Sequence, residues 1–182
     1  MKRVFLGVNL PEDLKLKIED LKLKYRLNQL PIKLVEKENS HIAVKFLDEL
    51  TDEQIDLINQ RIAEASGDFK RFPAQIQNSL VFPNLAKPRV LGLKVISPNL
   101  EGLAKKIFLS FAGLDFVLPE ERKYIPHITL GRVKDSLTPA EIEKISNLEL
   151  AESFFIDEIQ LFESQLTDSG PIYSVLKRFP LK

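Results

Sequence analysis

Two seven-residue segments of nearly the same sequence constrain this chain more than any other feature. They are HIAVKFL at residues 41–47 and HITLGRV at residues 127–133, and they begin with the only two histidines among the 182 residues. Histidine has an ordinary pKa of about 6.5, so it gives or takes a proton near neutral pH. Two histidines placed by the same local sequence predict a matched acid and base.

The duplication extends beyond the histidine segments. The segments RVFLG at residues 3–7 and RVLGL at residues 89–93 both begin 38 residues before a histidine (3 to 41 and 89 to 127). Each copy continues with a segment of helical period, the histidine strand, and a second helix whose start, at Thr51 or Thr138, has the pattern of a capping box. We therefore expect two related lobes that face each other.

Apolar periodicity predicts the other elements and the fold class. Helical stripes begin at Leu14, Ile55 and Leu100, and two strands are expected at residues 154–163 and 172–179, joined by a turn at residues 168–171. This mixture favours an α+β fold over a doubly wound parallel sheet. We expect one domain over residues 1–182 that is bilobal and pseudo-twofold. Its duplicated lobes would have antiparallel sheets, helices outside and a central groove between them.

Strand alternation predicts which side chains face the groove. His41, Ala43 and Lys45 should share the polar face of the first histidine strand, and His127 and Thr129 that of the second. Apolar side chains at the alternate positions should face the core; these are Ile42, Val44, Phe46, Ile128 and Leu130. Each histidine then lies on a polar sheet face, which favours a functional site over a buried structural imidazole.

Composition limits the classes of function. Lysine and arginine together number 26, as do aspartate and glutamate, so the formal net charge of zero argues against a general polyanion binder. The chain contains no cysteine, which excludes disulfides and thiolate metal sites. The sequence has neither a signal-peptide core nor an apolar stretch of about 20 residues. We expect a cytoplasmic protein without membrane attachment.

Other catalytic signatures are absent from the sequence. It has no H-E-x-x-H pair for zinc, no G-x-S-x-G nucleophile elbow, and no Walker or Rossmann glycine pattern. We therefore expect no metal site and no cofactor. The lack of a Walker loop also argues against an ATP-driven ligase, whereas ligation by reversal of a hydrolysis stays open.

The two histidine segments, together with their flanking residues, resemble the two-histidine (2H) phosphoesterases. The resemblance covers almost the whole chain, and within that group the chain looks most like the LigT-like RNA 2′,3′-cyclic phosphodiesterases, also called 2′-5′ RNA ligases. The supporting segments are FLGV leading into LPE near the N-terminus, PRVLGL at residues 88–93, PHITL at residues 126–130, and FES at residues 162–164.

The resemblance implies hydrolysis of a terminal 2′,3′-cyclic phosphate to give RNA that ends in a 2′-phosphate. By analogy with the family, His127 acts as the general base on the attacking water and His41 as the general acid toward the departing 3′-oxygen. The residues alone leave these two roles interchangeable, because both histidines have nearly the same neighbours. The partners expected are RNA 3′ ends or small nucleotides with a cyclic phosphate, bound by a monomer.

Two further residues are candidates for binding the phosphate. The Thr129 hydroxyl would donate to a non-bridging oxygen, and Arg132 would add a bidentate charged contact. Strict alternation, however, turns Arg132 to the face opposite His127. A bulge permitted by Gly131 would restore Arg132 to the groove face. Without such an irregularity, Arg132 would be a surface or core-edge residue.

The first motif departs from the family pattern at Ala43, where threonine or serine is expected. One phosphate donor is therefore missing, so we expect an enzyme that is slower or differently selective. Two alternatives remain: a catalytically weak protein of the same fold that binds RNA ends or nucleotides, and a 2H enzyme that acts on 2′,5′-linked or other cyclic phosphodiesters. Phe5 and Tyr124 are candidates either for stacking on a base or for ordinary packing.

Overall fold

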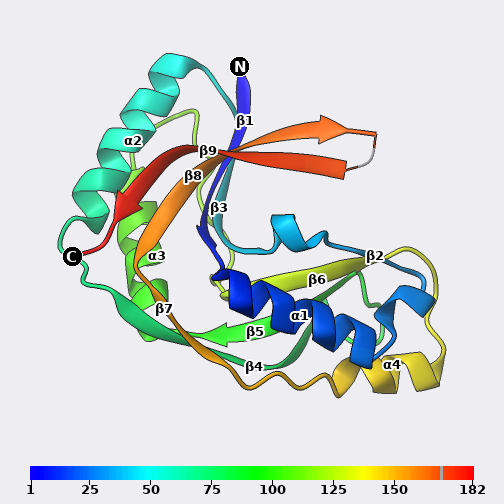
Figure 1. Ribbon diagram of the computed structural model, residues 1–182. Helices are drawn as coiled ribbons and strands as arrows, with labels where there is room; N and C mark the ends of the chain where they lie inside the picture. Colours follow the sequence, from blue (N-terminus) through cyan, green and yellow to red (C-terminus); the bar gives the residue numbers. More distant parts are fainter. Residues whose placement is uncertain (169) are drawn as a thin grey trace.

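The computed structural model describes residues 1–168 and 170–182, and one curled antiparallel sheet runs through the chain (Figure 1). Four α-helices and two short 3₁₀ segments, Leu27–Gln29 and Lys37–Asn39, accompany the strands of these residues. The strands are β1 (Lys2–Asn9), β2 (Ile32–Leu34), β3 (His41–Leu50), β4 (Phe72–Phe82), β5 (Val90–Ile96), β6 (His127–Val133), β7 (Ser153–Ile156), β8 (Glu158–Thr167) and β9 (Gly170–Pro180). The helices are α1 (Glu12–Lys24), α2 (Asp52–Ser66), α3 (Pro98–Ser110) and α4 (Pro139–Ser146).

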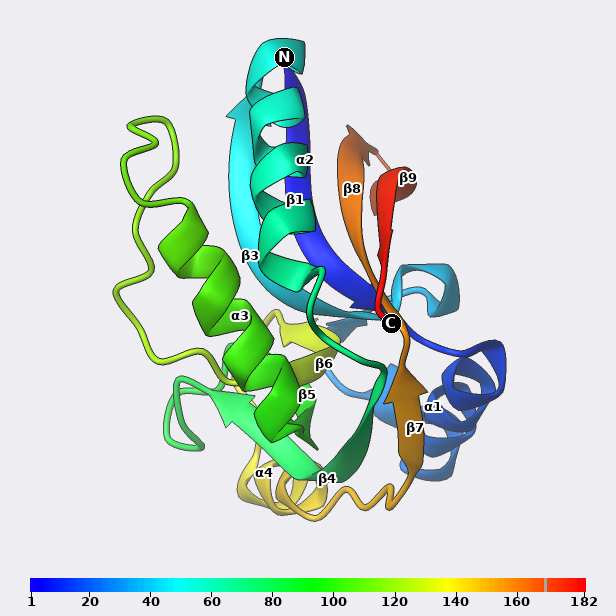
Figure 2. The ribbon, with the colours of Figure 1, turned by 90° about the vertical axis from the view of Figure 1, so that its left-hand side faces the viewer.

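The strands of the described residues pair in the order β7-β4-β5-β6-β3-β1-β8-β9, and β2 pairs separately with β6. Every pairing is antiparallel. Helices α2 and α3 pack against each other on one side of the curled sheet, and α1 and α4 lie near its other end (Figures 1 and 2). The α+β fold with antiparallel strands and outer helices is therefore confirmed.

The helices begin where their sequences predict. Thr51 and Thr138 each form a complete capping box: the threonine side chain accepts a hydrogen bond from the backbone N–H of Gln54 or Glu141, whose side chain accepts one from the backbone N–H of the threonine. Pro139 occupies the first turn of α4. The apolar stripes of α1, α2 and α3 are buried in one continuous core between the helices and the sheet. Each of these helices therefore covers the face of the sheet that is turned away from the histidines.

The two histidine strands meet at one point. The ladder between β3 and β6, as far as the structure describes it, consists of the pair Ile42 and Ile128, both fully buried. Beyond this pair, β3 continues beside β1, and the far end of β6 continues beside β2. The sheet therefore opens on either side of the junction, directly next to His41 and His127.

The segments outside the histidine strands differ from the sequence-based expectation in three places. The tail was expected as one strand over residues 154–163, but Asp157 separates β7, which pairs with β4, from β8, which pairs with β1. Neither the short strand β2 nor the eleven-residue strand β4 was expected. The turn expected at residues 168–171 lies partly outside the described residues, because it includes Ser169; the flanking strands β8 and β9 form the expected hairpin.

Candidate active site

His41 and His127 occupy equivalent places on the groove face of the sheet. Each opens its strand and precedes one member of the pair Ile42 and Ile128 that joins β3 to β6. Besides burial, positive charge on His127 lowers the pKa of His41, which reflects how near the two rings lie. The structure therefore places the two predicted histidines next to each other, on either side of the Ile42 and Ile128 pair.

Both imidazoles are held in the same way by the backbone two residues earlier. The Nδ1 atom of His41 lies 2.7 Å from the carbonyl oxygen of Asn39, and that of His127 lies 2.8 Å from the carbonyl oxygen of Ile125. Because a carbonyl oxygen only accepts hydrogen bonds, Nδ1 is the protonated nitrogen in both rings. Each Nε2 atom is then available to take or give a proton.

His41 lies among aromatic rings. Its ring centroid is 4.8 Å from that of Phe5 and 5.3 Å from that of Tyr173, and Phe162 stacks on Phe5. Burial lowers the pKa of His41, and the positive charges of His127 and Lys15 lower it further, against the opposing effect of the Asn39 hydrogen bond. The resting protein therefore favours the neutral form of His41.

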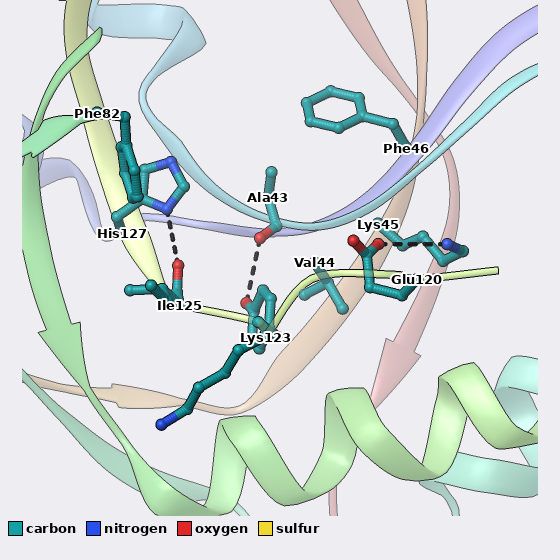
Figure 3. A pocket seen from close by; sticks show the side chains of 10 residues that line it. Ala43, Val44, Lys45, Phe46, Phe82, Glu120, Lys123, Ile125 and His127 are labelled. Atoms are coloured by element: carbon teal, nitrogen blue, oxygen red, sulfur yellow. Dashed lines mark hydrogen bonds and ion pairs between the residues drawn. The ribbon is translucent and has the colours of Figure 1, made fainter. Parts of the chain in front are cut away.

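His127 has a different environment on the other side of the groove. Its ring lies beside Phe82, with the centroids 5.0 Å apart (Figure 3). Gly92 lets the backbones of β5 and β6 approach closely, since a Cβ atom on Gly92 would lie 2.8 Å from the carbonyl oxygen of Ile128, whereas its distance of 3.6 Å from Cδ2 of His127 would be an ordinary contact. His127 therefore has one aromatic neighbour where His41 has several.

A bulge in β6 brings Arg132 onto the groove face. Thr129 pairs with Gly92, but Gly131 pairs with Leu91, so Leu130 is an extra residue in the ladder. Arg132 then pairs with Val90, which shares a face of β5 with Gly92, so Arg132 lies on the same side as Thr129 and His127. The predicted irregularity is present, with the bulge one residue before Gly131.

The first histidine strand contains the same bulge, and this corrects two predicted positions. Ala43 pairs with Gly7 but Lys45 pairs with Leu6, so Val44 is the extra residue. Lys45 is consequently turned to the core side, where it is 6% exposed and faces the Phe108 ring of α3. Phe46 is turned to the groove side, opposite Phe5, and is 63% exposed. The predicted faces of Lys45 and Phe46 were wrong because the bulge reverses the alternation.

The register also corrects the way the two copies are aligned. Equal spacing from the histidines matched Gly7 with Leu93, but the strands pair Gly7 with Ala43 and Gly92 with Thr129. The equivalent glycines are therefore Gly7 and Gly92, one residue away from the alignment expected. The connection between the two strands of the second copy is one residue longer.

A hollow of about 210 Å³ opens beside His127 where β3 and β6 diverge, and Ala43, Phe46 and Phe82 help to line it (Figure 3). The Tyr124 hydroxyl donates a hydrogen bond of 3.1 Å to the carbonyl oxygen of Ala43 at its base. Because Ala43 has no hydroxyl, this part of the wall offers no side-chain donor corresponding to Thr129.

Packing accounts for Phe5 and Tyr124, the two aromatic candidates. Phe5 is 2% exposed between the rings of Phe162 and Phe46, and burial raises the pKa of Tyr124 well above its ordinary value. Tyr173, which sequence reasoning missed, lies at the site instead, half-buried against His41. Burial raises the pKa of Tyr173, and the positive charges of Arg132 and Arg3 act against this rise.

Among the described residues, no three histidine, aspartate or glutamate side chains converge as metal ligands. No helix of the same residues is long and apolar enough to cross a membrane. The site is therefore described by two imidazoles, one hydroxyl and one guanidinium around an open groove.

A family model described as the 2′-5′ RNA ligase superfamily matches residues 10–168 of the chain. The chain belongs to this superfamily. Two archaeal proteins named RNA 2′,3′-cyclic phosphodiesterase are similar over nearly their full length. The protein of Methanocaldococcus jannaschii is 35% identical, over 97% of this chain and 99% of its own. That of Methanothermobacter thermautotrophicus is 31% identical, over 98% of each.

Solved structures of two bacterial proteins have the same fold. TT0787 of Thermus thermophilus superposes with a TM-score of 0.86 at 24% identity, covering 98% of this chain and 97% of its own. LigT of E. coli, solved with 3′-AMP, superposes with a TM-score of 0.83 at 22% identity, covering 100% of this chain and 98% of its own. These structures show the same fold, and the family model and the two archaeal relatives confirm the family predicted from the two histidine segments.

Proposed function

We propose that this protein hydrolyses the 2′,3′-cyclic phosphate at an RNA 3′ end to a 2′-phosphomonoester by two-histidine acid–base catalysis without a metal ion. One observation carries the proposal: two imidazoles face one groove, and each Nδ1 is bonded to a carbonyl oxygen so that each Nε2 is free. The name of the archaeal relatives, RNA 2′,3′-cyclic phosphodiesterase, supports this choice of substrate.

In the proposed reaction, His127 takes a proton from water while the water oxygen attacks phosphorus. The bond between phosphorus and the 3′-oxygen breaks, and His41 gives its proton to that oxygen, leaving the phosphate on the 2′-oxygen. Each proton transfer contributes a factor on the order of 10² to 10⁴ in rate. His41 must be protonated for this role although burial disfavours its charged form; the negative charge of the bound substrate acts to raise its pKa again.

Thr129 and Arg132 would stabilise the charge that develops on the phosphate. The Thr129 hydroxyl donates to one non-bridging oxygen, and the Arg132 guanidinium makes two parallel hydrogen bonds to the same group. Thr129 shares the face of β6 with His127 by ordinary alternation, and the bulge at Leu130 brings Arg132 to the same face. This common face is what a phosphate held next to the proposed base requires.

The test uses a short RNA that ends in a 2′,3′-cyclic phosphate, with EDTA present and ATP absent. We expect the wild type to release a 2′-phosphate product and both His41→Ala and His127→Ala to lose activity by roughly 10² to 10⁴. Absence of turnover by the wild type, or turnover that either variant retains, would overturn the proposal.

A substrate with sulfur in place of the 3′-oxygen separates the roles of the two histidines. Because a thiolate is a much better leaving group than an alkoxide, its departure needs no general acid. We expect this substrate to restore most of the activity of His41→Ala and little of that of His127→Ala. Rescue of His127→Ala instead would reverse the assignment of acid and base.

One observation favours a second candidate function, a catalytically weak protein that binds RNA ends or nucleotides. The groove has Ala43 where a hydroxyl is expected and the exposed Phe46 ring close by, so this wall lacks the hydroxyl donor that Thr129 supplies on the other strand. Tight binding of an RNA end without turnover would favour this candidate. A product from a 2′,5′-linked or other cyclic phosphodiester, with none from the 2′,3′-cyclic end, would indicate a different 2H substrate.

The proposal also takes residues 1–182 as a single domain that works as a monomer in the cytoplasm, where RNA ends with cyclic phosphates would be met. Light scattering should give the mass of one chain, and thermal unfolding should occur in one cooperative step. A dimer, or two separate unfolding transitions, would contradict this part of the proposal.

A further inference from the structure

The short strand β2 places a lysine beside Arg132. In the ladder between β2 and β6, Lys33 pairs with Arg132, and Leu34 pairs with Gly131. Opposed residues in an antiparallel ladder lie on the same face with their Cβ atoms about 4.5 to 5.5 Å apart. Lys33 is exposed, whereas Ile32 before it is buried in the core. Lys33 therefore extends the cationic groove face beyond Arg132, away from the histidines.

Gly131 is what allows β2 to lie this close to β6. A Cβ atom on Gly131 would lie 2.6 Å from Cγ2 of Ile32 and 2.8 Å from the carbonyl oxygen of Lys33, closer than real side chains approach. Any other residue would push the two strands apart. The glycine that the sequence suggested as a bulge former therefore serves mainly to bring Lys33 next to Arg132.

Among residues 1–168 and 170–182, the pair of cations has no internal counter-ion. None of the ion pairs between described residues includes Lys33 or Arg132. Like charges directly opposite each other on a sheet destabilise it, so this arrangement costs folding free energy. An anion in the groove would neutralise both charges, and one cyclic phosphate held by Arg132 leaves Lys33 without a partner.

We propose that Lys33 binds a second phosphate group of the substrate, the one on the 5′ side of the terminal nucleoside. This inference rests on the proposed function, in which the cyclic phosphate lies between the histidines, Thr129 and Arg132. Lys33 continues that row of groups by one position. The phosphate it binds is either the phosphodiester to the preceding nucleotide of an RNA or the free 5′-phosphate of a mononucleotide.

The experiment compares three substrates: a nucleoside 2′,3′-cyclic phosphate, the same compound with a 5′-phosphate, and a dinucleotide ending in a cyclic phosphate. We expect Lys33→Gln to leave kcat/KM for the first unchanged and to lower it about two- to fivefold for the dinucleotide, the range of an exposed ion pair. Lys33→Arg should keep most of the wild-type value. If Lys33→Gln lowers kcat/KM for the 5′-phosphorylated compound as much as for the dinucleotide, a free 5′-phosphate is sufficient for the contact. If only the dinucleotide is affected, Lys33 binds the phosphodiester of an RNA.

Salt dependence and stability distinguish a phosphate contact of Lys33 from a structural role. For the dinucleotide, the slope of log kcat/KM against log salt should become shallower by about 0.7, corresponding to one phosphate contact of a single strand. The thermal midpoint of Lys33→Gln should be equal to or above that of the wild type, because a like-charge pair is relieved. Lys70→Gln, which removes an exposed charge in the α2–β4 connection, is the matched control and should behave as the wild type.

Two results for Lys33→Gln would overturn the role of Lys33. One is an equal decrease in kcat/KM for all three substrates, and the other is an unchanged kcat/KM for both substrates that carry a second phosphate. If the wild type turns over none of them, the proposed function fails separately. The role of Lys33 is then decided by binding of a dinucleotide that ends in a 2′-phosphate, whose Kd should rise about two- to fivefold in Lys33→Gln. An unchanged Kd would overturn it.

Discussion

The half of the groove around His41 and the half around His127 are built on the same backbone. Each has a histidine whose Nδ1 is bonded to the carbonyl oxygen two residues earlier, a bulge three residues later, and a glycine on the neighbouring strand. The side chains at equivalent positions differ: Ala43 corresponds to Thr129, and Phe46 corresponds to Arg132. Duplication has therefore preserved the geometry of the site while the chemistry of its two halves has diverged.

The different side chains give the two halves different chemical environments. The half with Thr129 and Arg132 has the hydroxyl and the cation that suit a phosphate, and Lys33 extends it. In the copy that carries Ala43 and Phe46, the histidine itself, His41, lies against the rings of Phe5 and Tyr173, and its burial favours the neutral imidazole. If the halves were equivalent, matched substitutions would have matched effects, and this can be tested.

Among the tests of this comparison, the largest effect on kcat/KM is expected from removing the hydroxyl at Thr129 or adding one at Ala43. Thr129→Ala should lower kcat/KM by roughly 10² to 10³, the effect of losing one donor to a developing negative charge. Ala43→Thr should raise kcat/KM, because it adds a donor at the equivalent position. Valine at either position has the shape of threonine without its hydroxyl and serves as the control. An Ala43→Thr variant no faster than Ala43→Val would show that the first half makes no contact with the phosphate.

The equivalent glycines test whether the two backbones are as similar as the register indicates. A Cβ atom would lie 2.9 Å from the carbonyl oxygen of Ile42 in Gly7→Ala and 2.8 Å from that of Ile128 in Gly92→Ala. Both variants should lose about 1 to 3 kcal/mol of unfolding free energy, measured by urea denaturation, because a backbone oxygen cannot move aside. If the two variants lost clearly different amounts of unfolding free energy, the backbones of the two halves would not be equivalent at these glycines.

Gly102 supplies the control for these two variants. It lies in α3, and a Cβ atom there would have no neighbour within 4 Å. Gly102→Ala should therefore stabilise the protein by roughly 0.5 to 1 kcal/mol, through the better helix propensity of alanine. Destabilisation by Gly102→Ala would mean that the losses at Gly7 and Gly92 reflect something other than crowding.

The smallest expected effect is the pH dependence of stability in the aromatic half. Because the pKa of His41 is lower in the folded chain, where burial disfavours the charged ring, the unfolded chain binds the proton first as the pH falls below about 6.5. Wild-type stability should therefore decrease as the pH falls from about 6.5 toward the folded pKa. His41→Asn should lack this component in urea midpoints measured on either side of about pH 6.5, whereas His127→Asn should keep it. If the stability of His41→Asn depended on pH as that of the wild type does, burial would not be lowering the pKa of His41.

The sequence predicted the location of the site better than its shape. The repeated histidine segments and their capping-box helices are local signals, and each was confirmed as a structural element. The bulge of β6 was anticipated because Gly131 interrupts the pattern. The bulge of β3 was missed because Val44 and Lys45 are ordinary strand residues, and only pairing with β1 reveals the extra residue.

Tertiary contacts determine what the sequence could not show. The carbonyl partners of the histidines come from residues of any side chain, so no residue type marks them. Tyr173 reaches His41 only because β8 and β9 fold back beside β1, across more than 130 residues of chain. Lys33 lies next to Arg132 through a three-residue strand that is too short to have a readable period.

The single pair that joins the histidine strands makes the site resistant to changes in the angle between the two halves. Ile42 and Ile128 act as the pivot of any such rotation, and each imidazole is attached one residue from it. Displacement grows with distance from a pivot, so a rotation that shifts Phe46 and Arg132 moves His41 and His127 least. Substitutions that change the angle between the two strands should therefore alter the surroundings of the two imidazoles more than the distance between them.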